Sequence, residues 1–380
     1  MSSQAYTPGL KRKEKCVVKK VRKLPVPGEV LVKVGETVSP DTVIARASVP
    51  GKPVTCNIAY KLGVDPNEIE RYILKKFGDP ITENEPIALY KSLFGLIKRA
   101  CPSPCNGTIE HISNVTGQVI IREPPIEIEV NAYIPGTVIE TLPKEGAVIQ
   151  SPAAFIQGIF GIGGEAYGEL MMVSEKPEDV VEPKNITSDC KGKVLVGGAL
   201  VTGDALRKAL EVGAKAIVVG GINEMDLKNF LGYEIGVAIT GHEKIGLTLI
   251  LTEGFGEMRM LENTFDILKK FDGELACVNG ATQIRAGVLR PEVIIPRGDI
   301  SLDEFQEFEE DSCSQSTGLK VGTLVRIIRE PYFGALGKVV RLPAKLQKIE
   351  TESHVRVLEV ELKDKTRVTV PRANVEIIEE

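Results

Sequence analysis

The first half of the chain contains short runs in which apolar and polar residues alternate. Such runs cover residues 28–45, 103–112, 117–122 and 134–149, and each contains glycine, proline or both. Alternation with a period of two is typical of half-buried strands, and glycine and proline mark the turns between them. The pattern therefore predicts a β-rich region over residues 28–175, built from one or two small all-β units.

A helical pattern interrupts this region. An Asp-Pro pair precedes Ile69, Tyr72, Ile73 and Phe77, whose spacing is that of one face of a helix. Aspartate is a good N-cap, and proline suits the first helical turn. We therefore expect a helical insert near residues 57–98.

Strands and helices alternate in residues 190–297. The predicted strands cover residues 193–198, 216–221, 235–241 and 247–254, and the predicted helices cover residues 204–212, 224–231 and 258–271. Strands that alternate with helices are typical of a parallel sheet with both faces covered. This region is therefore predicted to be a doubly wound α/β domain.

The C-terminal region returns to short alternating runs. Residues 322–340 read Gly-Thr-Leu-Val-Arg-Ile-Ile-Arg-Glu-Pro-Tyr-Phe-Gly-Ala-Leu-Gly-Lys-Val-Val, and further β-type runs follow a polar stretch. Residues 319–380 resemble a KOW module, the SH3-like barrel of NusG-type elongation factors and several ribosomal proteins. The resemblance implies docking on RNA, ribosome or RNA polymerase, with Gly337 at the family's loop glycine. The candidate contact residues in this module are Arg326, Arg329, Tyr332, Phe333, Gly337, Lys338 and Arg341.

The N-terminal β pattern also resembles a known fold. The runs from Gly28 onward are similar to the halves of a biotinyl/lipoyl-like barrel-sandwich hybrid. The Met-Lys-Met or Asp-Lys-Ala tripeptide that carries the covalent cofactor is absent. The resemblance therefore implies a scaffold or docking surface and no cofactor.

Charge is distributed unevenly along the chain. The net charge is -5, which excludes a whole-protein basic field for nucleic acid. Residues 1–27 are nevertheless rich in lysine and arginine, and residues 298–318 are acidic. We expect a flexible basic arm, with Lys11, Arg12 and Lys13 available to phosphate, and an acidic linker before the barrel.

Composition narrows the class of protein. A chain of 380 residues with 43% hydrophobic and 26% charged residues predicts a soluble multidomain protein of β and α+β regions. Seven cysteines in no regular ladder, without a signal peptide or a long apolar run, indicate reduced thiols, no membrane span and a cytoplasmic location. Homo-oligomer formation stays open.

The predicted α/β domain offers a second candidate site. Ligands in open α/β sheets bind beyond the carboxyl ends of the strands. Glycines at those ends allow a small molecule, or another stretch of backbone, to come close. The residues at these ends are Gly197, Gly198, Gly220, Gly221, Thr240, Gly241, Thr252, Glu253 and Gly254.

The remaining motifs are weak. Gly161, Gly163 and Ala166 match a dinucleotide fingerprint, but a glycine-rich turn closing the β region explains them better. Cys101 and Cys105 lack the further ligands that zinc requires. Gln283, Arg285 and Arg290 suit an anion or a solvated loop equally. The three histidines form no recognisable catalytic arrangement, so no catalytic residue and no metal ligand is assigned.

These observations favour a non-enzymatic cytoplasmic factor that docks on the transcription or translation machinery. A redox or nucleotide-binding protein is one alternative, because a barrel-sandwich followed by an α/β domain is similar in layout to the C subunit of Rnf-type complexes. Another alternative is an assembly scaffold, because split lipoyl-like halves also occur in the membrane-fusion adaptors of efflux pumps. Bound colour or nucleotide would favour the first alternative, and ring or filament formation the second.

Overall fold

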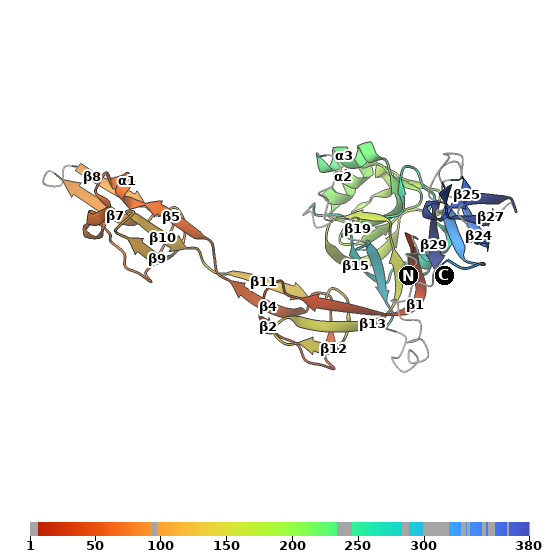
Figure 1. The fold of residues 1–380 in the computed structure, drawn as a ribbon, viewed down its shortest axis with the longest axis horizontal. Helices are drawn as coiled ribbons and strands as arrows, with labels where there is room; N and C mark the ends of the chain where they lie inside the picture. The colour runs from red at the N-terminus through yellow and green to blue at the C-terminus, as the bar shows by residue number, and fades with distance from the viewer. Residues whose placement is uncertain are drawn as a thin grey trace.

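The computed structural model shows a long arm that projects from a larger body (Figure 1). It describes residues 7–92, 97–233, 245–282, 289–298, 319–327, 332, 335–343, 347–348, 354–362 and 365–379. Strands dominate, several sheets are present, and a half-barrel lies at the C-terminal end. The mixed, strand-rich α and β architecture predicted from the sequence is confirmed at this level.

The far end of the arm is a small β unit with its own apolar core. Its sheet has the order β5-β10-β9-β6, formed by β5 (Pro53–Asn57), β10 (Gln118–Arg122), β9 (Gly107–Ser113) and β6 (Pro80–Ile81). A hairpin of β7 (Pro86–Ser92) and β8 (Ile97–Pro102) and the short helix α1 (Ile58–Leu62) complete the unit. We call it the distal unit.

The predicted helical insert is present only in part, because residues 57–98 contain α1 and a 3-10 helix but also the strands β6, β7 and β8. The capping role of Asp65 is confirmed, because its side chain accepts a hydrogen bond from the backbone of Asn67. The helix, however, is a single 3-10 segment over Pro66–Arg71. Ile73 then bridges to Ala88, because the backbone after the helix pairs with the β7 hairpin instead of continuing the helical hydrogen bonds.

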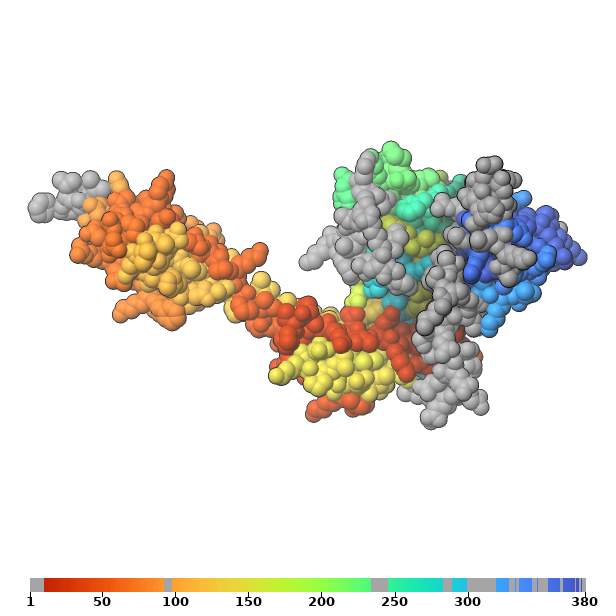
Figure 2. Space-filling model, viewed as in Figure 1, coloured from red at the N-terminus to blue at the C-terminus, as the bar shows by residue number. Residues whose placement is uncertain are grey.

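The base of the arm is a second β unit. A three-stranded sheet contains β2 (Glu29–Val30), β4 (Val43–Val49) and β11 (Ile126–Asn131), and β3 (Thr37–Val38) pairs with β12 (Gly136–Leu142). Only residues 50–52 and 123–125 lie between this unit and the distal unit, and Figure 2 shows a narrow waist there.

A long antiparallel pair connects the arm to the body. It consists of β1 (Thr7–Lys23) and β13 (Gly146–Gln157). The flexible arm expected over residues 1–27 is therefore corrected for residues 7–27, most of which form the strand β1. Leu10, Cys16 and Val18 of β1 are buried, so the lysines between them occupy a strand whose apolar side chains enter the core.

The body is a mixed sheet with helices on both faces. Four strands pair in parallel, in the order β15 (Glu165–Met172), β17 (Val194–Val196), β19 (Ala216–Ile222) and β20 (Thr248–Phe255). Two short strands, β16 (Val180–Val181) and β18 (Leu200–Val201), also pair in parallel, and β18 pairs in parallel with β19. The strands β14 (Phe160–Ile162), β21 (Leu275–Asn279) and β22 (Glu292–Pro296) add antiparallel pairs. The predicted N-terminal β region over residues 28–175 includes β14 and β15, yet both belong to the body sheet, because β14 pairs with β20 and β15 with β17.

The helices cover the two faces of the body sheet. The helices α2 (Gly203–Val212) and α3 (Glu224–Leu231) pack into one apolar core, and α4 (Glu262–Lys270) packs into another. Residues 235–241, predicted as a strand, lie outside the described residues. Within the described ranges, none of the helices combines the length and the apolar character needed to cross a membrane.

The C-terminal half-barrel is attached to the body by its last strand. Its strands are β23 (Leu324–Ile327), β24 (Leu336–Arg341), β27 (Val357–Leu362), β28 (Arg367–Pro371) and β29 (Val375–Glu379). Two further short strands, β25 (Gln347–Lys348) and β26 (His354–Val355), pair with each other. The strand β29 pairs in parallel with β1, so both ends of the described chain lie together beside the body (Figure 1). Nearly all of the acidic segment 298–318 lies outside the described residues.

Candidate functional site

Three charged residues that the sequence assigned to three separate features meet in one buried cluster. Arg12 lies on β1, Glu253 on β20 and Arg326 on β23. The Arg326 guanidinium donates to Glu253 Oε2, and Arg12 Nη2 lies 4.0 Å from Glu253 Oε1. The backbone N–H of Leu261 donates to the same Oε1 at 3.2 Å. We call Arg12, Glu253 and Arg326 the ionic triad.

The ionic triad joins the first strand, the body sheet and the half-barrel. Each of its residues is at most 5% exposed. A buried carboxylate is tolerated when cations and N–H donors surround it, because burial without partners costs several kcal/mol. Arg12 and Arg326 are therefore structural groups. Their expected contact with phosphate is corrected, since both side chains are buried and Glu253 is the counter-charge of each.

Other predicted contact residues do lie on the surface of the half-barrel. Tyr332 is 39% exposed, and Lys338 and Arg341 are exposed on β24. Arg329 and Phe333 fall outside the described residues. On β1, Lys11 and Lys13 are half-buried. The accessible part of the predicted surface is thus Tyr332, Lys338 and Arg341, which we call the barrel rim.

Carboxylates balance the charge near the barrel rim. Arg341 Nη1 lies 3.3 Å from Glu359 Oε1. Lys338 stands opposite Glu361 in the β24–β27 pair, and Glu361 also pairs with Arg367 at 3.0 Å. Paired exposed charges of this kind add little affinity for phosphate, because the cation already has a counter-charge.

Gly337 lies within β24 and not in the loop that the family resemblance implied, and it permits close packing inside the half-barrel. A Cβ atom at this position would lie 2.4 Å from Val360 Cγ1 and 2.5 Å from the Glu361 carbonyl oxygen. Contacts this short do not occur between real side chains, so the strands β24 and β27 approach closely only because residue 337 is glycine.

The glycines of the predicted crevice pack against the chain itself. A Cβ at Gly220 would lie 2.0 Å from the Met258 carbonyl oxygen, and one at Gly221 would lie 2.1 Å from that of Gly256. Gly197 and Gly198 are similarly close to Val181 Cγ2 and to the Asp179 carbonyl oxygen. These four glycines therefore accommodate neighbouring backbone and side chains of the protein itself rather than a small molecule.

The other crevice residues that the structure describes line no open site either. Thr252 is buried and its hydroxyl donates to the Val219 carbonyl at 3.4 Å. Gly254 adopts φ +134, a region that favours glycine, and Glu253 belongs to the ionic triad. Thr240 and Gly241 lie outside the described residues.

A cleft lies between the body and the half-barrel. Its volume is about 430 Å³. The body contributes Arg12 and the start of α4 at Leu261, Glu262 and Asn263, and the half-barrel contributes Leu324, Leu336, Gly337, Lys338, Glu361 and Leu362. Leucines and charged residues line it in equal number. Sequence reasoning missed this cleft because its walls come from segments that lie far apart in the chain.

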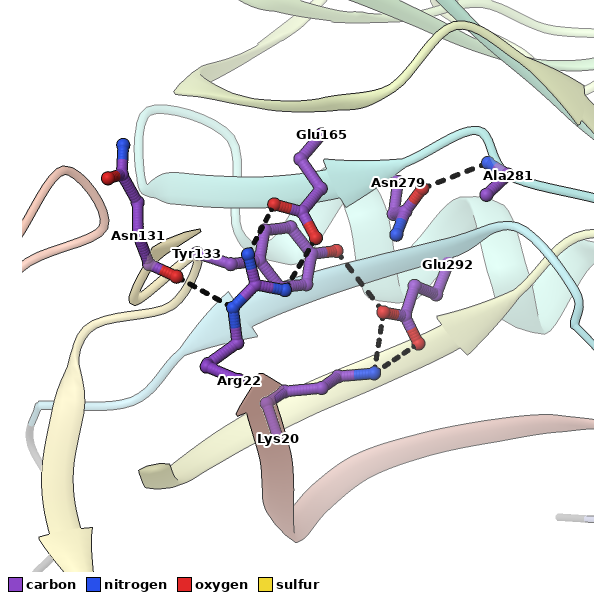
Figure 3. Close-up of polar contacts among 8 residues, drawn as sticks. All are labelled: Lys20, Arg22, Asn131, Tyr133, Glu165, Asn279, Ala281 and Glu292. Carbon is purple, nitrogen blue, oxygen red and sulfur yellow. Dashed lines mark hydrogen bonds and ion pairs between the residues drawn. The ribbon is translucent and has the colours of Figure 1, made fainter. Parts of the chain in front are cut away.

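A second polar cluster holds the arm to the body (Figure 3). Lys20 on β1 donates to both Glu292 oxygens at 2.5 and 2.6 Å, and the Tyr133 hydroxyl donates to Oε1 of the same residue at 3.3 Å. Arg22 binds Glu165 through two bonds of 2.6 and 2.7 Å and donates to the Asn131 carbonyl at 2.6 Å.

Burial raises the pKa values of two side chains at this junction. Tyr133 is 3% exposed, and burial together with the nearby Glu292 carboxylate raises the pKa of its phenol well above the usual value. Burial likewise raises the pKa of the Cys277 thiol in the same core to about 12, with Glu165 contributing. None of Tyr133, Glu165 and Glu292 was identified from the sequence, because they are isolated polar residues in β-type runs.

The weaker motifs occupy strands and core positions where they are described. Gly161 and Gly163 lie in and after β14, and β15 follows where a nucleotide fingerprint requires a helix. Cys101 is buried beside Cys56, and among the described residues no three His, Cys, Asp or Glu side chains gather as a metal site. Gln283 and Arg285 lie outside the described residues, while Arg290 is half-buried.

Comparison with known proteins does not identify a family. No protein-family model matches the chain, and no curated protein matches it in sequence.

Proposed function

We propose that this chain is a non-enzymatic cytoplasmic factor that docks through its half-barrel on the transcription or translation machinery. The observation that carries the proposal is the way the half-barrel is attached. The strand β29 pairs with β1, and Arg326 reaches Glu253, so one side of the half-barrel is fixed to the body. The exposed barrel rim is left for a partner.

The half-barrel is proposed to be a KOW-type, SH3-like module. Its five strands pair in the order β28-β27-β24-β23-β29, as expected of a small antiparallel barrel. The tight packing at Gly337 gives a physical reason for glycine at the position that matches the family's loop glycine. The strand order supports the proposal independently of the sequence resemblance, whereas Gly337 supports it only together with that resemblance.

The remaining parts are proposed to serve as a scaffold. The arm units, with short strands joined by tight turns, fit a barrel-sandwich origin, and the body fits a doubly wound α/β domain with α2 and α3 on one face and α4 on the other. Free thiols at Cys56, Cys101, Cys105, Cys190 and Cys277 support a reducing compartment.

A protein surface of that machinery is the favoured contact. RNA binding by phosphate neutralisation requires cations without counter-charges. Glu359 and Glu361 instead accompany Arg341, Arg367 and Lys338. An exposed tyrosine and exposed charges with nearby counter-charges, all on one half-barrel, are a typical composition for a protein contact.

A pulldown from native lysate tests the proposal. The triple variant Tyr332→Ala, Lys338→Ala and Arg341→Ala removes the barrel rim without touching the ionic triad. The matched control, Leu31→Ala, Lys33→Ala and Lys52→Ala, removes one exposed apolar residue and two exposed cations from the arm. We expect wild type and control, but not the rim variant, to retain ribosomal or polymerase proteins.

Nuclease and salt distinguish the kind of partner. Retention that survives nuclease and falls only weakly with salt supports a protein contact. Loss on nuclease treatment assigns the contact to RNA and overturns the protein preference. Equal retention by wild type and rim variant, or no ribosomal or polymerase protein in any sample, overturns the proposed function.

A further inference from the structure

Two cysteines touch inside the distal unit. Cys56 lies on β5 of the sheet, and Cys101 lies on β8 of the covering hairpin. Their Sγ atoms are 3.4 Å apart, and the side chains are 2% and 0% exposed. Two sulfur atoms already in contact need a shift of little more than about 1 Å to reach bonding distance.

A lysine stands over one of the two thiols. Lys61 of α1 places its ammonium 3.4 Å from Cys56 Sγ, while Cys101 contacts the other thiol. Cys105 is a further titratable group near Cys56, and the carboxylates of Glu83 and Glu123 act on Cys105 and not on the pair itself. The cation therefore favours a thiolate at Cys56 in particular.

The two thiols consequently differ in acidity. The hydrogen bond from Cys101, together with the charge of Lys61, lowers the pKa of Cys56 to about 6 against the opposing effect of burial. The same hydrogen bond, burial and the neighbouring negative charge raise the pKa of Cys101. A reactive thiolate beside a protonated thiol is the arrangement of a nucleophile and its resolving partner.

We propose that Cys56 and Cys101 form a peroxide-reactive dithiol, in which Cys56 is the nucleophile, Cys101 resolves it, and Lys61 positions and activates Cys56. The oxidant class follows from burial. A thiol that is 2% exposed admits hydrogen peroxide more readily than a bulky disulfide. The site is separate from the barrel rim and extends beyond the proposed docking function.

The reaction balances with peroxide alone. The Cys56 thiolate attacks one oxygen of hydrogen peroxide and the O–O bond breaks, so that Cys56 becomes a sulfenic acid. The hydroxide that leaves becomes water by taking up the proton that Cys56 released to solvent when it ionised. The Cys101 sulfur then attacks Cys56, the S–O bond breaks, and the Cys101 proton leaves with the hydroxide as a second water. Two thiols are oxidised by two electrons while one peroxide is reduced to two waters.

Sulfenic acid formation also prepares the second step. The negative charge at Cys56, which raises the pKa of Cys101, is lost when the sulfenic acid forms. Cys101 then deprotonates more easily and lies within contact distance of its target. The resulting disulfide would join the sheet and the hairpin of the distal unit through β5 and β8.

Peptide mapping of the full-length chain tests the proposal. Reduced protein is treated with one equivalent of hydrogen peroxide, the remaining thiols are alkylated, and the digest is analysed by mass spectrometry. We expect a Cys56–Cys101 cross-linked peptide and the loss of two of the seven thiols. A cross-link between Cys101 and Cys105, or oxidation spread evenly over the cysteines, overturns the proposal.

Variants separate the three roles. Cys101→Ser should leave a sulfenic acid at Cys56, detected as one added oxygen on the Cys56 peptide, whereas Cys56→Ser should give no such addition at Cys101. The ultraviolet absorbance of the thiolate should rise with a midpoint near pH 6 in wild type but not in Cys56→Ser, and Lys61→Met, but not Lys61→Arg, should move that midpoint upward. Cys190→Ser is the control and should change neither result. A Cys56 midpoint in the wild type at or above the ordinary thiol pKa of about 8.5 contradicts the assigned roles.

Discussion

At the residue scale, the ionic triad shows how charge that looks solvent-accessible in a sequence becomes structural. Arg12 and Arg326 occur in segments rich in cations, where phosphate binding is a natural interpretation. In the folded chain both contact Glu253, and all three side chains are at most 6% exposed. The free energy of the fold, and not that of partner binding, should therefore depend on them.

Removing one member of the triad should be costly. Glu253→Gln leaves two buried guanidinium groups without their carboxylate, and Arg326→Met leaves the carboxylate with one distant cation. Each change should lower the free energy of unfolding by about 3–5 kcal/mol. Urea denaturation followed by circular dichroism measures it. The surface change Glu359→Gln, beside Arg341, is the control and should cost less than about 1 kcal/mol. Equal costs for triad and surface variants would contradict the structural role.

A second prediction concerns Gly337. Gly337→Ala forces a methyl group against Val360 and the Glu361 carbonyl, so the half-barrel should lose about 1–3 kcal/mol of stability. Gly298→Ala is the control, because no described atom lies within 4 Å of the point where a Cβ of residue 298 would stand. Hydrogen exchange of the half-barrel amides reports the difference. Unchanged exchange in Gly337→Ala would mean that β24 and β27 are not in close contact.

Tyr133 predicts a dependence of stability on alkaline pH. Its folded pKa is raised above the unfolded value of about 10, so the fold favours the neutral phenol. The contribution is intact below about pH 10 and is lost as the pH rises toward the folded pKa. Tyr133→Phe should therefore lose less stability than wild type between about pH 8 and pH 11, as measured by the urea midpoint. Parallel losses in the two proteins would show that Tyr133 does not titrate in this way.

At the scale of elements, strands and helices are predicted correctly from the sequence where the local pattern of apolar and polar residues determines them. The alternating runs from Gly28 onward form strands, and the helix predicted over residues 204–212 agrees with α2 (Gly203–Val212). Predictions failed where long-range pairing overrides local pattern. Residues 66–77 have helical spacing, yet Ile73 bridges to Ala88.

The candidate sites show the same difference between features that a local pattern predicts and features that need contacts between distant parts of the chain. Tyr332, Lys338 and Arg341 are exposed on the half-barrel, as expected of contact residues. The burial of Arg326 depends on Glu253, which is 73 residues away in the chain. The cleft and the junction cluster likewise require contacts between distant strands, which no local pattern encodes.

The first strand gives a direct test at this scale. A flexible basic arm would be cut at once by trypsin after its many lysines and arginines. In β1, Lys20 and Arg22 form ion pairs, and Cys16 and Val18 enter the core, so cleavage between residues 11 and 23 should be slow. Limited proteolysis with mass spectrometry follows the sites in time. Val18→Asp, which places a charge in the core, should expose them, whereas Val21→Asp at a 56% exposed position should not.

At the scale of the whole molecule, the shape places the proposed docking surface of the half-barrel far from the proposed dithiol of the distal unit. The half-barrel and the body share β1 and the ionic triad, while the distal unit lies at the far end of the arm (Figure 1). A compact chain of this length would have a radius of gyration of about 21 Å. Small-angle scattering should give a clearly larger value for the wild type, because the arm extends the distribution of interatomic distances.

Excision of the distal unit tests whether the proposed docking surface and the proposed dithiol are independent. In the antiparallel pair of β4 and β11, Val49 stands opposite Ile126, so a two-residue Asn-Gly turn between them can replace residues 50–125, which also removes Pro50 and Pro125 from the turn. The shortened chain should fold, have a smaller radius of gyration, and keep the partner that the barrel rim retains in the pulldown. It should also lose the peroxide-dependent cross-link, because Cys56 and Cys101 are both removed. A well-folded shortened chain without the partner would place the docking surface on the arm, since the half-barrel, the body and their shared strand are unchanged.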